Sequence, residues 1–227
     1  ISTNIASQSV QKNLKEVSQK GDSELEKLSS GKRITKSADD AAGLAIATNL
    51  EAQTKGLRQA TRNANDGISL VQTAEGGMNE VSNILVRLRE LTVQAASDTV
   101  GDSERGFLNK EYQNLVKEVD RISKSTTFNG TSLLEGKSGK GTLDFQVGAF
   151  AGEQNVIAFD ADATNVSSDN IGIGGTGIEG KESALDSIAT IDKAIENVSG
   201  QRANLGAIQS RLASTVSNLE VQTINQD

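Results

Sequence analysis

A seven-residue spacing of apolar and small side chains between Leu57 and Ala95 restricts the fold of this chain more than any other feature. Two columns, three residues apart, run through the segment: Leu57, Ala64, Val71, Met78, Leu85 and Thr92, and Ala60, Gly67, Ala74, Val81, Leu88 and Ala95. A heptad repeat sustained over this length is typical of a helix that packs lengthwise against other helices. The chain contains no proline, so we expect one long helix over residues 41–96, with curvature or local loosening near Gly76 and Gly77.

Three further segments place apolar residues at helical spacing and predict helices of their own. Residues 1–30 carry one narrow stripe, interrupted at Gly21 and formed by Val10, Leu14, Val17, Leu25 and Leu28. Residues 107–124 predict a third amphipathic helix, and a fourth begins near Ser183. The heptad column of the fourth contains Ile191, Val198, Leu205, Leu212 and Leu219. Because an isolated helix with one narrow stripe is marginal in water, the first helix needs a partner.

The pattern between the third and fourth helices is that of short strands. β-forming residues run into the turn dipeptide Asn129-Gly130, and apolar and polar residues alternate over 143–147 and, less cleanly, over 155–159. These features predict one or two small hairpins within residues 128–180. The expected fold class is therefore mainly α, a long antiparallel helical bundle or coiled coil with a small β-hairpin insert.

The amino-acid composition excludes most kinds of catalytic and metal-binding site. Cys and His are both absent, which removes thiolate nucleophiles, thiolate metal sites, the commonest metal ligand and the usual general base near neutrality. A net charge of −7 disfavours nucleic acid, whose binding requires basic surfaces. No apolar run approaches the roughly 18 residues of a membrane span. We expect a protein that is not an enzyme, holds no cofactor or metal, and binds neither nucleic acid nor membrane.

Two glycine-rich segments resemble nucleotide-binding motifs, and both are better interpreted as turns. Residues 172–177 match GxGxxG, but no βαβ unit surrounds them, so a flexible turn is the favoured interpretation. Gly136-Lys137-Ser138 resembles the end of a Walker A motif, but the distance to Gly130 is one residue too long. A hairpin loop is expected there instead.

Short polar motifs are similarly better explained by structure. Asp39 and Asp40 are adjacent and would not face the same side of a helix, so a capping role is favoured over a metal pair. We expect Ser37 or Asp39 to cap the long helix, and Asp40 to suit its positive dipole end. N-glycosylation patterns begin at Asn129, Asn165 and Asn197, but this three-residue pattern occurs by chance.

A stripe beside the heptad seam contains Arg87, Leu91 and Gln94. A leucine flanked by arginine and glutamine is typical of a protein-contact surface, where arginine and apolar anchors are favoured. The alternative is that Leu91 only widens the core face and Arg87 is solvated, since broad apolar faces are normal for core helices. The pattern alone leaves both interpretations open.

Several segments, in order along nearly the whole chain, resemble the terminal signatures of bacterial flagellin. They are residues 28–34 (LSSGKRI), 39–46 (DDAAGLAI), 62–69 (RNANDGIS), 89–94 (RELTVQ), 128–130 (FNG) and 205–212 (LGAIQSRL). The resemblance implies export as an unfolded chain and polymerisation into an extracellular helical filament whose core is formed by paired terminal helices. It also implies an export chaperone, a cap protein and further copies of the chain as partners.

Under this resemblance, residues 1–35 are expected to be the amino-terminal filament-core helix. Residues 36–127 and 181–227 would form a discontinuous helical domain, with residues 128–180 as its β-hairpin region. The short segment between the two signatures implies a minimal flagellin without large outer domains. Family members also have a few residues before Ile1 and a further helix beyond Asp227, so we expect the carboxy-terminal core helix to be missing from this sequence.

Flagellins similar to this chain are bound by Toll-like receptor 5 of animals. The contact positions of the family correspond here to Arg87, Leu91, Gln94 and Glu111. The same surface packs between subunits in filaments, so the resemblance favours the interface interpretation of this stripe. The alternative within the family is a hook–filament junction protein. From a different class, a coiled-coil adaptor or receptor ligand would have a defined partner and form no polymer.

Overall fold

The structure, a computed structural model, describes residues 4–136 and 141–226. Its helices are α1 (Ile5–Ser30), α2 (Ala41–Ala95), α3 (Asp102–Ser125) and α4 (Lys181–Gln226), with the short 3-10 helix η1 (Glu153–Asn155). The strands are β1 (Thr127–Phe128), β2 (Thr131–Ser132), β3 (Thr142–Gln146) and β4 (Val156–Asp160). The mainly α class with a small hairpin insert is confirmed, as is a single long helix through Gly76 and Gly77.

The chain divides into two compact units, and each is described by itself. One contains α1 and the beginning of α2, and the other comprises Lys55–Asn225. The predicted domains, with a boundary at residue 35 and a hairpin region at 128–180, were assigned by the roles that the family resemblance implies. The two units are defined by compactness instead, so the predicted domains stay a prediction.

Helix α1 is closed by local hydrogen bonds at its start and by a glycine at its end. The Asn4 side chain accepts the Ser7 amide at 3.1 Å, and Gly31 takes a left-handed conformation with φ of 64°. The helix passes through Gly21 without interruption. Its apolar stripe is uncovered, since Val10, Leu14 and Val17 are 66%, 71% and 67% exposed.

Asp40 caps α2, which corrects the expectation that Ser37 or Asp39 would do so. The Asp40 carboxylate accepts the Gly43 amide at 2.9 Å, three residues on, as an N-cap does. Asp39 instead organises the preceding loop, because its Oδ2 accepts the backbone amides of Thr35 and Lys36. Those two donors, Thr35 first, lower the pKa of the Asp39 carboxyl.

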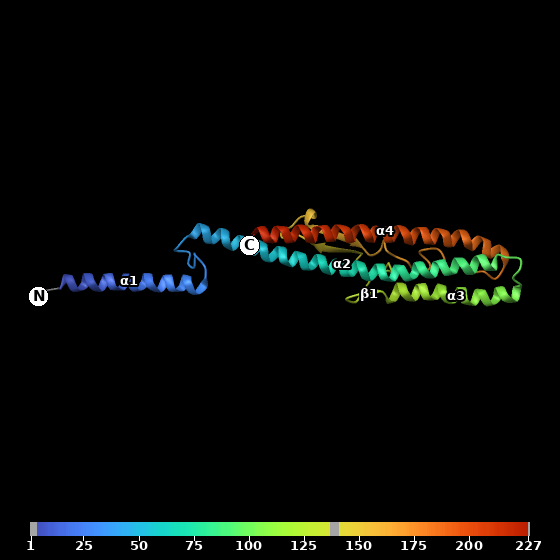
Figure 1. Ribbon diagram of the computed structural model, residues 1–227. Coiled ribbons are helices and arrows are strands. Elements are labelled where there is room, and N and C mark those ends of the chain that lie inside the picture. Colours follow the sequence, from blue (N-terminus) through green and yellow to red (C-terminus); the bar gives the residue numbers. More distant parts are fainter. Residues whose placement is uncertain (1–3, 137–140, 227) are drawn as a thin grey trace. The chain divides into compact units, whose positions relative to one another are not determined.

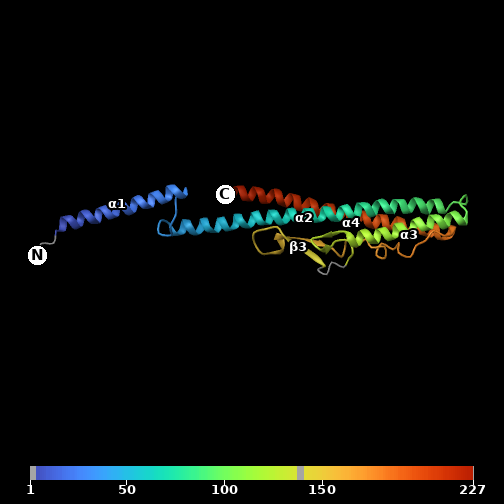
Figure 2. The same cartoon turned by 90° about the horizontal axis from the view of Figure 1, so that it is seen from below.

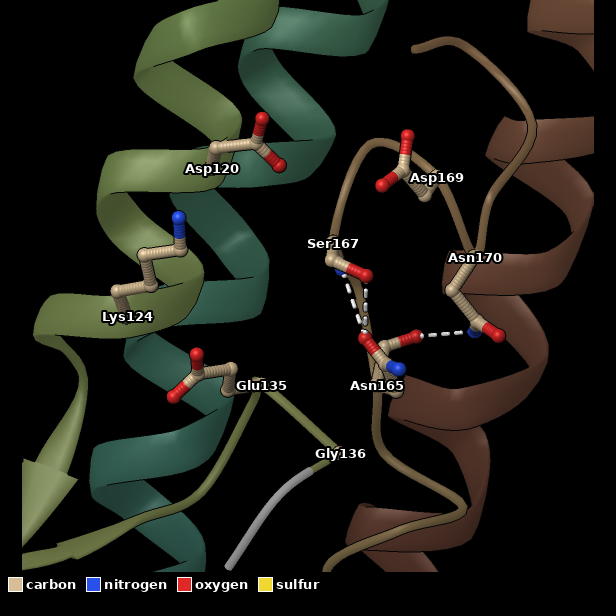
Figure 3. A pocket seen from close by; sticks show the side chains of 8 residues that line it. All are labelled: Asp120, Lys124, Glu135, Gly136, Asn165, Ser167, Asp169 and Asn170. Carbon is tan, nitrogen blue, oxygen red and sulfur yellow. Dashed lines mark hydrogen bonds between the residues drawn. The ribbon is translucent and has the colours of Figure 1, made fainter.

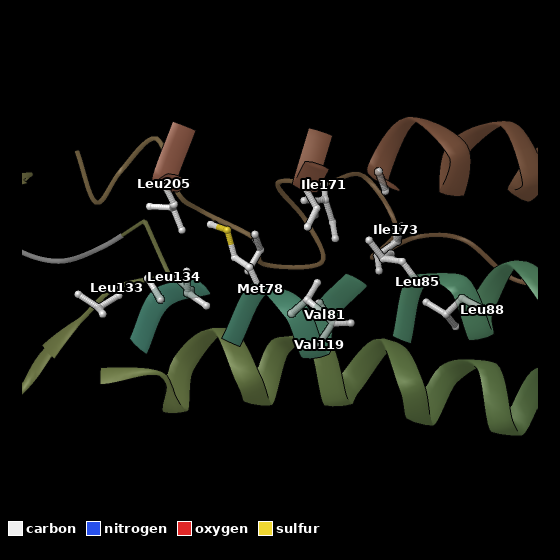
Figure 4. Close-up of a cluster of buried hydrophobic side chains, with 14 of the residues drawn as sticks. Met78, Val81, Leu85, Leu88, Val119, Leu133, Leu134, Ile171, Ile173 and Leu205 are labelled. Atoms are coloured by element: carbon white, nitrogen blue, oxygen red, sulfur yellow. The ribbon is translucent and has the colours of Figure 1, made fainter. Parts of the chain in front are cut away.

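Within the unit Lys55–Asn225, α3 and α4 lie along α2, and both run antiparallel to it (Figures 1 and 2). Both heptad columns of α2 and the column of α4 are buried. Figure 4 shows how Met78, Val81, Leu85 and Leu88 of α2 meet residues from the rest of the unit. Those residues are Val119, Leu133, Leu134, Ile171, Ile173 and Leu205. The core is therefore long and thin, which suits a chain with only 3% aromatic residues.

Two antiparallel hairpins form, as the turn dipeptide and the alternation predict, and they pack against α2. Phe128 pairs with Thr131 in the first hairpin, and Leu143 pairs with Phe159 in the second. Residues 161–180 contain turns and no strand, so the hairpins occupy only the first part of the predicted region. No helix in the described ranges has the length and apolar character needed to cross a membrane.

Glycine on α2 allows the first hairpin to approach closely. A Cβ atom at Gly77 would lie 2.7 Å from both Leu134 Cδ1 and Thr126 Oγ1. Gly76 has nothing within 4 Å. The cost of Gly77 to the helix, about 1 kcal/mol by intrinsic propensity, is therefore offset by packing that a larger residue would prevent.

Candidate interaction surface

Arg87 on α2 forms an ion-pair network with carboxylates of α2 and α3. Its Nε and Nη2 donate to Glu111 Oε1 at 3.1 and 2.8 Å, and its Nη1 donates to Glu90 Oε2 at 2.9 Å. The Glu90 and Glu111 hydrogen bonds raise the pKa of the Arg87 guanidinium. The Arg87 and Glu111 side chains remain 49% and 46% exposed, so the pair is solvent-facing.

The stripe expected from spacing is split between surface and core. Gln94 is exposed, whereas Leu91 is 1% exposed and belongs to the core cluster. The structure therefore brings Arg87 and Glu111 into contact and leaves Gln94 accessible on the same helix. Leu91 widens the core face, as the second interpretation expects, and Arg87 is paired as well as solvated. The contact-surface interpretation of the stripe stays a prediction.

Two long-range ion pairs join α2 and its following turn to α4, and the sequence motifs did not reveal them. Arg89 Nε donates to Asp192 Oδ1 at 2.6 Å, and Lys181 Nζ donates to both oxygens of Asp98 at 2.8 and 2.7 Å. Their residues are 103 and 83 positions apart in the chain. The only sequence signal was opposite charge on two antiparallel heptad helices, whose relative axial register is not encoded in local spacing.

A buried arginine closes the carboxy-terminal end of α2. Arg105 Nε and Nη2 donate to the carbonyls of Ala95 and Ser97 at 2.9 and 3.0 Å, and its Nη1 donates to Asp102 at 2.9 Å. Carbonyls at a helix end lack intrahelical partners and favour cations. The Arg105 side chain therefore holds the α2–α3 turn, from which Asp98 reaches Lys181.

The GxGxxG segment is a turn region anchored to α3. Thr176 hydrogen-bonds the Tyr112 hydroxyl, Gln113 Nε2 donates to the Thr176 carbonyl at 2.9 Å, and Ile173 is buried. The expected turn is confirmed, and helix α4 begins only at Lys181. The strand–turn–helix arrangement required for a dinucleotide cradle is not formed in this described segment.

A polar pocket of about 440 Å³ lies between α3 and the loop that precedes α4 (Figure 3). Asp120 on its wall accepts the Ser168 amide and hydroxyl at 2.8 and 2.9 Å, and Asn165 Oδ1 accepts the amide and hydroxyl of Ser167. Across the described ranges, no three His, Cys, Asp or Glu residues are grouped to hold a metal ion. Of Gly136-Lys137-Ser138, only Gly136 lies within the described residues.

Helix α1 leaves an apolar stripe uncovered, and the unit Lys55–Asn225 is a helical bundle with solvent-facing ion pairs. Both features are typical of a structural protein that packs against partners. Two models of one protein family match this chain. The model for the bacterial flagellin N-terminal helical region matches residues 1–139, and that for the C-terminal helical region matches residues 188–227. The chain belongs to the bacterial flagellin family and is a flagellin without large outer domains.

Individual relatives agree with this assignment. The chain is 44% identical to a flagellin of Halalkalibacterium halodurans, over 88% of this chain and 72% of the relative. It is 39% identical to flagellin FlaB2 of Treponema pallidum, over 88% and 74%. The crystal structure of Bacillus cereus flagellin matches with a TM-score of 0.61 at 28% identity, over 70% of this chain and 88% of that chain. The chain is thus a structural subunit of the extracellular flagellar filament.

Proposed function

We propose that α1, within residues 1–35, contributes to filament assembly by packing its apolar stripe against helices of neighbouring copies. The observation that carries this proposal is the exposure of the stripe, because Val10, Leu14 and Val17 are each about two-thirds uncovered or more. Burying one such side chain stabilises an interface by roughly 1.5–3 kcal/mol. A helix that carries one narrow apolar stripe is only marginally stable in water unless a partner covers the stripe.

In the same proposal, the helical domain 36–127 and 181–227, with its hairpin region 128–180, packs laterally against neighbouring copies. The subunit is secreted through the flagellar export route with the help of an export chaperone, and it is added beneath a cap protein. Family membership supports these steps, and the absence of Cys is permissive for a protein outside the cell.

The assembly proposal is tested by sedimentation and electron microscopy of the intact protein under polymerising conditions. A Leu14→Glu and Val17→Glu double variant should remain monomeric, because two carboxylates would be buried in the proposed interface. Gln19→Glu places a carboxylate on the opposite, polar face of α1 and should assemble normally. Filaments formed equally well by the double variant would contradict a role for this stripe.

We further propose that Arg87, Gln94 and Glu111 form a surface recognised by Toll-like receptor 5, with Leu91 supporting it from the core. The Arg87–Glu111 pair supports this proposal because it holds two charged groups in a defined orientation across α2 and α3. Pre-organised arginines are favoured anchors in interfaces. Leu91 would act by holding α2 in place, since its side chain is 1% exposed.

A receptor reporter assay with soluble, unassembled protein tests this second proposal. Arg87→Ala should reduce potency by about tenfold or more, as expected for a hot-spot arginine. Arg121→Ala is the matched control, because Arg121 is an exposed arginine on α3 that is paired with Glu118 at 2.6 Å. Equal potency of the two variants would exclude Arg87 from the recognised surface.

Within the family, the alternative role is that of a hook–filament junction protein, and only the fold supports it. A putative flagellar hook-associated protein of Vibrio parahaemolyticus matches with a TM-score of 0.66 over 85% of this chain and 97% of that chain, but at 15% identity, which shows the fold alone. Immunogold labelling of intact flagella separates the candidates. Label along the full filament supports the subunit role, and label confined to the hook–filament boundary supports the junction role.

A further inference from the structure

The first hairpin ends in a two-residue turn with an unusual backbone. Asn129 and Gly130 have φ of 48° and 76°, and Asn129 is the one non-glycine residue with positive φ in the described ranges. Two consecutive positive φ values define the type I′ turn that favours Asn-Gly. Both residues are exposed, and the hairpin protrudes past the end of α3 (Figure 1).

Asn129 combines the three conditions under which an asparagine attacks its own backbone. Its neighbour Gly130 has no Cβ to shield the backbone nitrogen. Within the described chain, no hydrogen bond holds the Asn129 side chain or the Gly130 amide. The sheet that restrains the turn consists of only two residue pairs, so opening the turn to bring nitrogen and carbonyl together disrupts little structure.

We propose that Asn129 is a site of spontaneous covalent modification, in which the side-chain amide is lost through a cyclic imide. The Gly130 nitrogen forms a bond to Asn129 Cγ, the bond from Cγ to Nδ2 breaks, and ammonia leaves with the proton of the Gly130 nitrogen. One water molecule then opens the imide at either carbonyl. Opening at one carbonyl gives aspartate, and opening at the other gives isoaspartate, in which the backbone runs through the former side chain.

Four other asparagines in the described chain are protected by their surroundings. Asn63, Asn65 and Asn197 lie inside α2 or α4, where the following backbone nitrogen points along the helix. The side-chain amides of Asn63 and Asn65 also donate to carbonyls at 3.0 Å, and Asn165 Oδ1 is held by Ser167. The modification should therefore concentrate at Asn129.

The base of the hairpin is fixed, which confines the consequence to its tip. Leu133 donates its amide to the Thr126 carbonyl at 3.1 Å, and Thr126 and Leu134 both pack against Gly77 of α2. Aspartate suits the same turn type and adds one negative charge. Isoaspartate lengthens the backbone within the turn, so the Phe128–Thr131 pair is lost while the buried Leu133 and Leu134 stay in the core.

Peptide mapping by mass spectrometry, after the intact folded protein is incubated in mildly alkaline buffer, tests the proposal. Fragmentation or enzymatic methylation distinguishes isoaspartate from aspartate. The expected result is both products at Asn129, accumulating before any product at Asn63, Asn65 or Asn197. An intact Asn129 amide after those helical asparagines have reacted would overturn the proposal.

Gly130→Ala supplies the mechanistic control, because its Cβ shields the attacking nitrogen and should slow the loss of the amide several-fold. Alanine is strained at a φ of 76°, so circular dichroism must first show that this variant is folded. Asn129→Gln is the second variant, since its longer side chain closes a larger and slower-forming ring. An unchanged rate in Gly130→Ala, or equally fast conversion in Asn129→Gln, would also overturn the cyclic-imide route.

Discussion

Helices α1 and α2 carry similar apolar stripes but satisfy them differently. The stripe of α1 is exposed along its length, whereas both heptad columns of α2 are buried by α3, α4 and the hairpins. The spacing of apolar residues therefore predicts that a helix needs a partner, but not where the partner comes from. In the unit Lys55–Asn225 the partners belong to the same chain, and for α1 we propose that they belong to other copies.

The largest expected effect separates these two kinds of stripe. Leu205→Ala removes a fully buried side chain from the core and should lower the free energy of unfolding by about 2–5 kcal/mol. Leu14→Ala truncates a side chain that is 71% exposed and should change it by less than about 0.5 kcal/mol. Urea unfolding of unassembled protein, followed by circular dichroism, measures both. Comparable losses would mean that α1 is already covered within the monomer.

The ends of the two helices provide a smaller contrast. Helix α1 ends at the left-handed Gly31, whereas α2 is closed by the buried Arg105 guanidinium. Arg105→Ala leaves the Ala95 and Ser97 carbonyls without that donor, and unfolding should become easier by about 1–3 kcal/mol. Arg121→Ala removes an exposed pair, whose contribution is generally below about 1 kcal/mol. If thermal unfolding places both variants together, the proposed closure of α2 is incorrect.

Alanine substitutions at glycines of α1 and α2 should have smaller effects on stability. Gly77→Ala would place a Cβ 2.7 Å from Leu134 and Thr126, and overpacking of this kind should cost about 1–3 kcal/mol. Gly76→Ala and Gly21→Ala meet nothing within 4 Å and should stabilise their helices by up to about 1 kcal/mol each. Denaturant midpoints report the change at residues 76 and 77, and helical circular dichroism reports the change at Gly21. A stabilising Gly77→Ala would show that the hairpin does not press against α2.

Much of the fold could be predicted because its determinants are local. The heptad columns gave the buried faces of α2 and α4, and the absence of proline predicted one helix through Gly76 and Gly77. The cap of α2 was misassigned because Ser37, Asp39 and Asp40 are all competent capping residues, and only the backbone path selects Asp40.

The candidate site was less predictable because it depends on how helices are placed against one another. Spacing grouped Arg87, Leu91 and Gln94, but rotation of α2 in the bundle buries Leu91 and exposes the other two. The Arg87–Glu111 contact was implied only by family resemblance. Arg89–Asp192 and Asp98–Lys181 require the axial register of α2 against α4, which no local motif specifies.

The smallest expected effects are those of acid on one carboxylate in each region. The Lys181 hydrogen bond lowers the pKa of Asp98 from its ordinary value of 3.8, and the backbone amides of Thr35 and Lys36 lower that of Asp39. A depressed carboxyl pKa contributes stability above the unfolded value, and that contribution is lost as pH falls through the folded value. Stability should therefore be flat between about pH 6 and 8, where no histidine titrates, and fall below the ordinary carboxyl pKa.

Substituting each carboxylate separately shows how much of the acid response comes from its region. Asp98→Asn should weaken the pH dependence of thermal unfolding, and Asp39→Asn should instead speed amide hydrogen exchange at Thr35 and Lys36, the backbone donors it holds. Both side chains are solvent-facing, so salt should reduce the Asp98 effect, which depends on an ion pair. Salt should barely change the Asp39 effect, which depends on backbone hydrogen bonds. An unfolding transition centred near neutral pH would contradict both assignments, since neither carboxylate changes its charge there.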